Sequence, residues 1–415
     1  MTVREICQKA KNARAAIAAS EAPVRNSALY NAADLLCDEG EMLKLLQANA
    51  IDMKNAKDNG ISEVMTDRLR LDDKRIFAIA NALRDLAKQP DPLGKGEIFT
   101  LENGLRIQKL TVPLGTVGII YESRPNVTAD AAAICIKTGN TAVLRGGKEA
   151  VNTNAAIADI MRRAASLAGL SEDTVCFIRD TDRSAVTEMM EARGLIDVLI
   201  PRGGKGLINA VCSGSAVPVI ETGAGNCHIY VEKSANFESA IEIIKNAKLQ
   251  RPGVCNAAES LLLDREIIGE FLPRLYSETR EKRLQFRTCP ECYEVLPNSV
   301  RATEEDYYEE YNDYIISVKA VSGVREAVEH INKYSTHHSE AIITENIAAA
   351  EHFTKNVDSA CVYVNASTRF TDGGVFGFGA EIGISTQKLH ARGPMGPDAL
   401  TSVKYTVIGS GQIRE

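Results

Sequence analysis

From residue 114 onward the chain alternates short apolar runs with helical segments, and this alternation limits its fold more than any other feature. The apolar runs lie at residues 117–121, 141–144, 175–178, 198–200 and 217–220. Strict alternation of strand and helix predicts a parallel sheet covered by helices, which binds ligands at the carboxyl ends of its strands. A second alternation begins near residues 228–231, continues through Leu261, Ile315 and Ile342, and ends near residues 361–364. The sequence therefore predicts two α/β domains.

Two further kinds of segment flank this alternation. From Val3 to about Gln89, apolar residues recur at helical spacing, which predicts three or four amphipathic helices. Residues 97–101 and 105–110 alternate apolar and polar residues around an Asn-Gly dipeptide, which is typical of a β-hairpin. A stable hairpin needs a third strand, which we expect residues 403–408 to supply from this or another subunit.

Composition argues against several classes of protein. The 415 residues carry 48 Lys plus Arg against 55 Asp plus Glu, a net charge of −7. This acidic balance, without basic blocks, favours neither nucleic acid nor a membrane surface as a partner. No apolar run approaches the roughly 18–20 residues that span a bilayer, and residues 1–10 carry charges where a signal peptide is apolar. We therefore expect a cytoplasmic protein whose ten cysteines are mostly buried thiols.

Cys255 is the best candidate for a nucleophile. It follows Arg251, Pro252 and Gly253, on a bend just after a helical pattern ends. A nearby Arg favours the thiolate, and the backbone N–H of Cys255 together with the Asn256 side chain would stabilise an oxyanion. On spacing alone, a buried structural cysteine remains the alternative.

Two loops carry residues suited to binding phosphate groups. Gly203, Gly204 and Lys205 follow a strand and precede a helix, which favours a phosphate; a plain glycine-rich turn is the alternative. Arg145 and Lys148 close another strand. Two cations there favour the 2′-phosphate of NADP(H) over the ribose of NAD(H), although a solvated basic turn would have the same sequence.

Other signals are weaker. Glu221 opens the glycine-rich residues 221–227, where it would act as a base or be an incidental part of a hinge. Cys289 and Cys292 have C-x-x-C spacing, but they lie in an irregular polar stretch without a second ligand pair. Residues 304–314 are interpreted as a solvated acidic surface. We therefore expect no metal site.

Together these segments resemble the aldehyde dehydrogenase superfamily, and within it the γ-glutamyl phosphate reductase family. The resemblance covers essentially the whole chain and rests on residues 121–128, 221–227, 251–259, 330–332 with 338–340, 364–370 and 376–383. It implies an aldehyde dehydrogenase-like α/β fold with a Rossmann-type cofactor domain, a catalytic domain and a small β-hairpin oligomerisation element. The expected boundaries are residues 1–96 and 112–226, residues 227–388, and residues 97–111 and 389–415, respectively. A homo-oligomer is implied as well.

The resemblance also implies catalytic and cofactor-binding residues. Cys255 occupies the position of the nucleophile, and Glu221 that of a general base in many oxidising members. Arg145 stands where many members have a Lys that contacts the cofactor ribose. Lys148 stands where NAD-preferring members often carry Glu, which agrees with NADPH and NADP⁺ as cofactors.

Three positions correspond less directly. The superfamily's oxyanion-hole Asn aligns with Arg124 without gaps and with Asn126 only after a two-residue shift. Glu310, or the neighbouring Glu309, corresponds to a ribose-binding Glu. Asn365, within the shared residues 364–370, is expected to bind substrate.

The activity implied is the reduction of L-glutamyl 5-phosphate by NADPH to glutamate 5-semialdehyde and phosphate, through a thioester on the catalytic cysteine. The family places this step second in proline biosynthesis, after a glutamate 5-kinase that is a plausible partner. By their chemistry, Arg124, Lys205 and Arg251 are the candidate cations for the substrate phosphate. Two alternatives remain: a general aldehyde dehydrogenase that releases free acid, which the cationic site disfavours, and a binding or structural protein without turnover.

Overall fold

The computed structural model describes residues 1–61, 63–122 and 124–414, and the chain divides into two compact units. The first unit comprises Met1–Glu221, Gly377–Gly383 and Met395–Glu415, and the second comprises Thr222–Phe376 and Ile384–Pro394. The boundary expected at residue 226 therefore differs slightly from the observed one. Gly377–Gly383, expected in the catalytic domain, belongs to the first unit.

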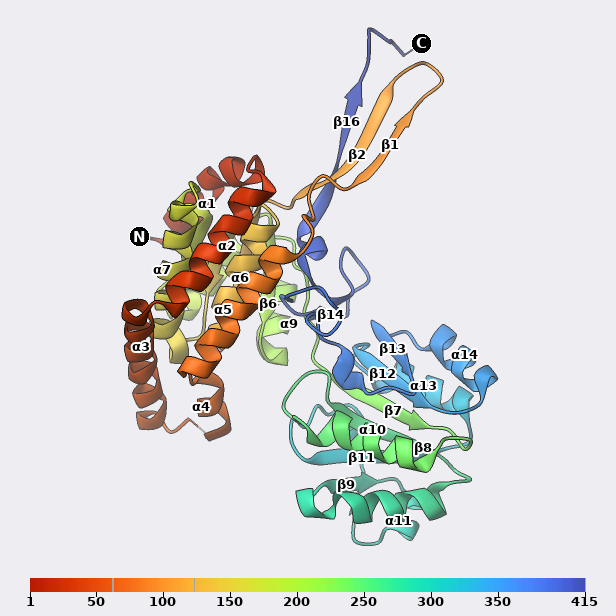
Figure 1. The fold of residues 1–415 in the computed structure, drawn as a ribbon. Helices are drawn as coiled ribbons and strands as arrows, with labels where there is room; N and C mark the ends of the chain where they lie inside the picture. The colour runs from red at the N-terminus through yellow and green to blue at the C-terminus, as the bar shows by residue number, and fades with distance from the viewer. Residues whose placement is uncertain (62, 123, 415) are drawn as a thin grey trace. The chain divides into compact units, whose positions relative to one another are not determined.

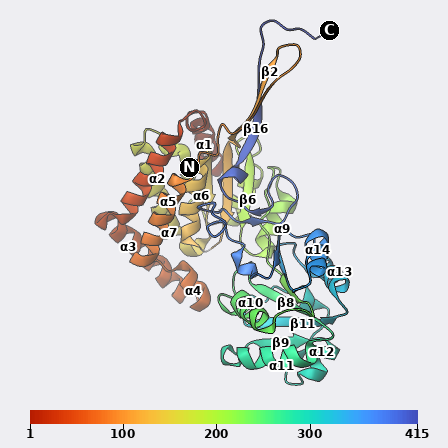
Figure 2. The same cartoon turned by 45° about the vertical axis from the view of Figure 1, so that its right-hand side comes forward.

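Helices open the first unit. They are α1 (Val3–Ala18), α2 (Ala22–Cys37), α3 (Glu39–Asp58), α4 (Glu63–Leu69) and α5 (Asp73–Lys88). Side-chain caps define several of their starts: Thr2 forms a capping box with Glu5, Asp38 caps α3, and Asp72 caps α5. Figure 2 shows α2 and α5 side by side with α6 and α7 of the α/β part. The predicted helical character of this stretch is confirmed, but the described residues form five helices where three or four were expected.

A parallel sheet forms the centre of the first unit. Its strands are β3 (Thr116–Tyr121), β4 (Thr141–Arg145), β5 (Val175–Phe177) and β6 (Val198–Arg202), in the order β5-β4-β3-β6. The associated helices are α6 (Pro125–Lys137), η1 (Lys148–Ala150), α7 (Val151–Leu167), η2 (Glu172–Thr174), α8 (Arg183–Met190) and α9 (Lys205–Gly214). Chain order reverses between β3 and β6, and such a switch point is where open α/β sheets bind ligands.

The strand expected at residues 217–220 does not form. Val219 makes a single bridge to Leu199 of β6, flanked by hydrogen bonds from Leu199 to Pro218 and from Ile220 to Leu199. Pro218 has no N–H to donate, so a longer ladder on this edge is disfavoured.

The predicted hairpin is confirmed. β1 (Gly96–Thr100) and β2 (Arg106–Pro113) are antiparallel, and Gly104 takes a φ of +87° in the turn between them. The third strand comes from the same chain, because β16 (Thr401–Ile408) pairs with the whole of β2. Figure 1 shows the three strands as a long ribbon that projects from the helices of the first unit.

The second unit is built on a seven-stranded sheet in the order β10-β9-β11-β8-β7-β12-β13, with parallel neighbours throughout. Its strands are β7 (Cys227–Val231), β8 (Ala258–Asp264), β9 (Gln285–Thr288), β10 (Val300–Arg301), β11 (Ile315–Val321), β12 (Ser339–Ile343) and β13 (Cys361–Val364). The helices are α10 (Phe237–Leu249), α11 (Ile268–Thr279), η3 (Arg280–Lys282), α12 (Pro290–Val295), η4 (Glu305–Tyr307), α13 (Val324–Tyr334), α14 (Ile347–Asn356) and η5 (Thr368–Phe370). The second predicted α/β domain is confirmed.

Short elements complete the chain: β14 (Ile384–Ser385) pairs with β15 (Gly393–Pro394), and η6 (Pro397–Leu400) precedes β16. Within the described residues, we find no helix that combines the length and apolarity needed to cross a bilayer.

Two segments expected to be irregular and solvated are folded into the second unit. Residues 290–295 form α12, and both cysteines of the C-x-x-C pair are buried. In residues 304–314, Asp306 and Tyr307 are buried. The Asp306 carboxylate accepts hydrogen bonds from Arg287 (2.7 Å) and Tyr311 (2.9 Å). The ion pair with Arg287 offsets the cost of burying this charge, and no local charge pattern reveals it.

Candidate functional site

Cys255 lies in the turn between α10 and β8. The turn is closed by a hydrogen bond from the Ala257 N–H to the Val254 carbonyl (3.0 Å). The Cys255 residue is partly exposed. Its backbone carbonyl accepts the Cys227 thiol at 3.2 Å. The structure places this cysteine on a bend, as expected; its catalytic role remains a prediction.

A buried ion pair joins the two ends of this turn. Lys248, in the last turn of α10, lies 2.5 Å from Glu259, the second residue of β8, and both side chains are fully buried. Burial raises the pKa of Glu259 to about 8 and lowers that of Lys248. Removing one partner of such a pair leaves the other buried alone, at a cost of about 3–5 kcal/mol. The pair therefore holds α10 and β8 at a set separation around Cys255.

The glycine-rich segment before β7 braces the same turn. A Cβ at Gly225 would lie 1.4 Å from the Cys255 carbonyl oxygen, so only glycine fits at this approach. The Glu310 carboxylate accepts the Gly225 N–H at 2.8 Å. Glu310 is expected at the cofactor ribose; in this structure one of its carboxylate oxygens holds the segment before β7, and its role at the ribose stays a prediction. The neighbouring Glu309 is exposed.

Replacing Gly225 with Ala is expected to lower the free energy of unfolding by about 2 kcal/mol or more, because backbone atoms must move to admit the methyl group. Gly269→Ala in α11 is the matched control, since its Cβ would meet nothing within 4 Å. Chemical denaturation of both variants measures the difference. Equal stability of the two variants would show that the Gly225 approach is not tight in solution.

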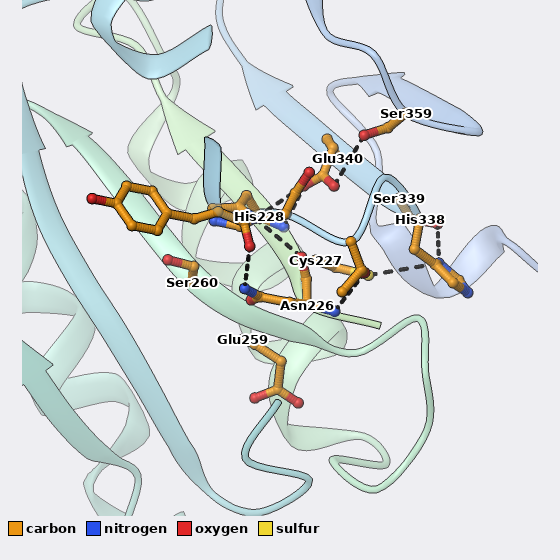
Figure 3. Close-up of polar contacts among 12 residues, drawn as sticks. Asn226, Cys227, His228, Glu259, Ser260, His338, Ser339, Glu340 and Ser359 are labelled. Atoms are coloured by element: carbon orange, nitrogen blue, oxygen red, sulfur yellow. Dashed lines mark hydrogen bonds and ion pairs between the residues drawn. The ribbon is translucent and has the colours of Figure 1, made fainter. Parts of the chain in front are cut away.

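A buried polar network anchors this segment to the sheet (Figure 3). The Glu340 carboxylate on β12 accepts the backbone N–H of His228 on β7 (2.6 Å) and lies 3.2 Å from the His228 ring nitrogen Nδ1. Cys227 Sγ lies 3.7 Å from His338 Nδ1. Burial raises the pKa of Cys227 well above its ordinary value. Cys227 therefore keeps its proton and can donate it to the Cys255 carbonyl.

Asn256 is buried, and its side chain is engaged by the η5 segment. Its amide nitrogen donates to the carbonyls of Thr371 (2.9 Å) and Arg369 (3.4 Å), and its amide oxygen accepts from the Arg369 guanidinium. The Thr368 hydroxyl donates to the Asn256 carbonyl (2.7 Å). Both amide hydrogens point at backbone carbonyls. In this structure Asn256 therefore positions the η5 segment, and its donation to an oxyanion at Cys255 stays a prediction that would need these hydrogen bonds to rearrange.

Arg369 is the residue near Cys255 that the sequence analysis did not assign. It is partly buried, and its Nε donates to Gln250 Oε1 at 3.1 Å. Burial, together with the charge of Arg251, lowers its pKa, and the Cys255 thiolate opposes this shift. Two guanidinium groups thus lie in the electrostatic neighbourhood of Cys255. Arg369 belongs to the shared residues 364–370, but no local pattern relates it to a cysteine so distant in sequence.

Asn365, which is expected to bind substrate, forms hydrogen bonds with the neighbouring strand end. It has a φ of +53°, in the left-handed region that Asn tolerates. Its amide oxygen accepts the Thr344 N–H, and its amide nitrogen donates to the Thr344 carbonyl, both at 2.9 Å. This pair of bonds joins the ends of β12 and β13. Asn365 therefore has a structural role at the ends of these strands, and its contact with substrate stays a prediction.

In the first unit, the loops after β3 and β6 flank the switch point. Gly203 and Gly204 follow β6, and the Gly204 N–H donates to the Glu122 carboxylate after β3 (3.0 Å). A Cβ at Gly203 would lie 2.5 Å from that carboxyl carbon. The glycines do cradle an anion, but it is the protein's own carboxylate. The phosphate contact at Gly203 and Gly204 stays a prediction that would require Glu122 to be displaced. Lys205 at the start of α9 is exposed.

Arg124 and Asn126 stand at the start of α6. Arg124 is the N-cap residue and is partly buried. Asn126 is exposed, and its amide donates to Asp130 (3.1 Å), which leaves a second amide hydrogen. Burial raises the pKa of Asp130 to about 6.

Replacing Asp130 with Asn is expected to stabilise the protein above about pH 6 by about 1 kcal/mol, after allowance for partial solvation. The folded pKa lies above the ordinary value of 3.8. Folding therefore favours the protonated acid, and this contribution is complete below about pH 4 and is lost as the pH rises through about 6. Denaturation of both proteins at several pH values measures the difference. A difference that does not change between about pH 4 and pH 8 would contradict the perturbed carboxyl.

Arg145 and Lys148 lie at the end of β4. Arg145 Nη2 donates to the carbonyls of Thr181 (2.6 Å) and Asp182 (3.3 Å), and its buried Nε has no hydrogen-bond partner among the described residues. Burial lowers the pKa of Arg145. The Lys148 ammonium is exposed and makes no ion pair with the described part of the chain. Arg145 therefore shapes the loop, and Lys148 is the accessible cation.

Glu221 is the last residue of the first unit and is partly exposed. It adds to the effect of burial in raising the pKa of Cys212 on α9. Cys255 belongs to the second unit. The predicted site residues named here therefore fall in two sets, one in each unit. The second unit holds Arg251, Cys255 and Asn256. The first unit holds Arg124, Asn126 and residues 203–205.

Comparison with known proteins identifies the class. A family model described as the aldehyde dehydrogenase family matches residues 1–287. The chain belongs to the aldehyde dehydrogenase family, and the predicted fold is confirmed. An acetylating aldehyde dehydrogenase from Geobacillus thermoglucosidasius shares the fold, at 20% identity and a TM-score of 0.72 over 100% of this chain and 97% of that one.

Relatives with higher sequence identity carry the name gamma-glutamyl phosphate reductase. The gamma-glutamyl phosphate reductases of Caldanaerobacter subterraneus subsp. tengcongensis and Clostridium acetobutylicum are each 52% identical to this chain. The first match covers 100% of both sequences, and the second covers 100% of this chain and 99% of the relative. The crystal structure of gamma-glutamyl phosphate reductase from Thermotoga maritima is 47% identical, with a TM-score of 0.96 over 100% of both chains. The resemblance inferred from the sequence is confirmed.

Proposed function

We propose that this protein reduces L-glutamyl 5-phosphate to glutamate 5-semialdehyde and phosphate, the second step of proline biosynthesis from glutamate, with NADPH as reductant. The full-length similarity to gamma-glutamyl phosphate reductases supports the substrate. The observation that carries the mechanism is a partly exposed thiol, Cys255, on a turn braced by Gly225 and lying near Arg369.

In this mechanism the Cys255 thiolate attacks the acyl carbon of the substrate. A C–S bond forms, the C–O bond to phosphate breaks, and phosphate leaves without a general acid because it is already a good leaving group. NADPH, when bound, supplies the hydride that reduces the resulting thioester. Collapse at the carbonyl carbon then releases the aldehyde and restores the thiolate. No step requires Glu221 as a base, so we assign it a positional role.

The oxyanion formed at each addition needs hydrogen-bond donors. The backbone N–H of Cys255 is one, and a well-placed donor contributes about 3–4 kcal/mol. With Asn256 committed to backbone carbonyls, Asn126 remains the proposed second donor.

Cations stabilise the two anionic partners of the first step. Arg369 favours the thiolate because it is held beside Cys255 by Gln250 and Asn256. Arg251 is exposed and makes no hydrogen bond or ion pair with the rest of the described chain. It is therefore our first candidate for the substrate phosphate, followed by Arg124 and Lys205 of the first unit.

The cofactor 2′-phosphate is assigned to Lys148. Its exposed ammonium at a strand end suits a phosphate, whereas Arg145 is already committed to backbone carbonyls. Replacing Lys148 with Glu should lower the NADPH to NADH ratio of kcat/KM by about 10–100-fold, the value of one charge-assisted contact. Lys9→Glu, a charge reversal at an exposed position of α1, is the matched control. An unchanged ratio in the Lys148 variant would place the phosphate elsewhere.

The reaction type is tested in the reverse direction. Reduction of NADP⁺ by glutamate 5-semialdehyde should require inorganic phosphate or arsenate. In this mechanism one of these oxyanions, and not water, cleaves the thioester. Equal rates with and without phosphate would instead support a general aldehyde dehydrogenase that releases the free acid.

We also propose that a second copy of the chain covers the outer face of β16. Val403, Tyr405 and Val407 on this strand are about half exposed, at 47%, 59% and 55%. Apolar side chains on an extended strand are typical of an interface. Light scattering of the purified protein should give the mass of a dimer or a larger oligomer; a monomer would refute this assignment.

A further inference from the structure

The C-x-x-C pair of the second unit has no part in the function proposed above. Cys289 follows β9 directly, Pro290 is the first residue of α12, and Cys292 lies in its first turn. Both residues are buried, with 6% of Cys289 and none of Cys292 exposed. The two cysteines therefore share one helical turn.

Their spacing suits a covalent bond between them. Cys289 is the N-cap residue of α12 and Cys292 its third residue, a spacing at which Cβ atoms are about 5–6 Å apart. A disulfide needs Cβ atoms about 3.5–4.5 Å apart, so its formation requires a small inward shift of the backbone at the start of α12 as well as side-chain rotation. The backbone around Cys289 is held by the neighbouring strand β11: its N–H donates to the Val318 carbonyl at 2.9 Å.

The Cys289 sulfur is surrounded by donors. The Ala320 N–H of β11 donates to it at 3.4 Å, and the Cys292 thiol on the same helical turn is a second donor. The Lys319 ammonium and the Arg265 guanidinium add positive charge in the neighbourhood. Donors and cations both favour a thiolate.

The two thiols differ in acidity as a result. The hydrogen bond from Cys292 outweighs burial and lowers the pKa of Cys289 to about 6. The same hydrogen bond, together with burial, raises the pKa of Cys292 far above its ordinary value. A pair of neighbouring thiols of which one is the more acidic is the arrangement found in redox-active dithiols.

A metal is the less favoured occupant. A structural zinc site takes four ligands. Across the described residues there is no group of three or more His, Cys, Asp or Glu side chains that could hold a metal ion. The pair thus has the chemistry of a dithiol and lacks the ligands of a metal site.

We propose that Cys289 and Cys292 form a reversible disulfide when the protein meets a low-molecular-weight disulfide. The Cys289 thiolate attacks one sulfur of the reagent, forming a mixed disulfide and releasing one thiolate. Cys292 then gives up its proton to that thiolate, and its sulfur attacks Cys289 Sγ and displaces the second thiolate. Two cysteines are oxidised by two electrons, and the reagent is reduced to two thiols.

This site is separate from Cys255. The pair follows the carboxyl end of β9, whereas Cys255 precedes the amino end of β8, and both strands pair in parallel with β11. The two positions therefore lie at opposite ends of the parallel strands of one sheet.

Trypsin gives a direct readout, because residues 288–301 lie between Arg287 and Arg301 and contain Cys289 and Cys292 as their only cysteines. The full-length reduced protein is incubated with oxidised glutathione, blocked with N-ethylmaleimide in denaturant, digested and weighed. We expect this peptide to be two hydrogens lighter and unlabelled, and dithiothreitol to restore labelling at both positions.

Single replacements separate the two roles. Cys292→Ser should trap a glutathione adduct on Cys289, and Cys289→Ser should give neither disulfide nor adduct in this peptide. Cys212→Ser removes an exposed thiol on α9 and should leave the disulfide intact. Full labelling of both cysteines in the oxidised original protein would overturn the proposal, whatever the folding of the variants.

Discussion

Cys255→Ala is expected to lower the kcat for reduction of L-glutamyl 5-phosphate by about 10⁴-fold or more, the scale seen when a catalytic nucleophile is removed. Alanine leaves no atom to carry the acyl group, so the two-step route through a thioester is lost. The turn itself should survive, because the close approach of Gly225 is to backbone atoms of residue 255, which alanine keeps. Steady-state kinetics in both reaction directions measures the effect.

Two controls distinguish lost chemistry from lost structure. Binding of NADPH to the Cys255 variant, followed by its fluorescence, should be unchanged. Cys37→Ala removes another half-buried thiol, on α2, and should keep full activity. Retention of more than about a tenth of the original kcat by Cys255→Ala would remove this residue from the mechanism.

Arg369→Ala is expected to lower kcat/KM by about 10²–10³-fold, the range for loss of one charged group that stabilises developing or resident charge. The guanidinium is held by Gln250 and Asn256 beside the Cys255 turn. Its removal takes away a cation that favours the thiolate and frees the amide oxygen of Asn256. Arg369→Lys keeps the charge and should recover part of the loss.

A second readout separates charge from packing. The rate of alkylation of Cys255 by iodoacetamide should rise at higher pH in Arg369→Ala than in the original protein, because the thiolate has lost a stabilising charge. Arg369→Lys should follow the original profile more closely. Identical alkylation profiles in all three proteins would mean that Arg369 acts only by holding Asn256.

The fold could be predicted from local patterns because its elements are local. The alternation of apolar runs and helical segments gave both parallel sheets, and the Asn103-Gly104 dipeptide gave the hairpin. The errors arose where tertiary contacts determine the local structure or the burial of a residue. Pro218 limits the strand expected at residues 217–220 to one bridge, and the Arg287 ion pair buries Asp306 in a segment that appears solvated by composition.

The candidate site was predictable in part. The position of Cys255 on a bend followed from the end of a helical pattern and the Pro-Gly pair before it. The polar residues around it were harder, since their partners are distant in sequence. Asn256 is hydrogen-bonded to residues 369–371, and Glu310 to Gly225. These partners are far apart in the sequence, so local spacing does not predict the hydrogen bonds.

The most direct test of the central claim is the acid-quenched reaction of the enzyme with glutamate 5-semialdehyde and NADP⁺ in the absence of phosphate, followed by peptide mapping. Residues 249–265 form a tryptic peptide in which Cys255 is the only cysteine, because trypsin does not cleave before Pro252. The mechanism predicts one added glutamyl group on this peptide, which disappears when phosphate is added before the quench. NADPH formed in the first turnover without any adduct at Cys255, or with the adduct on another cysteine, would contradict it.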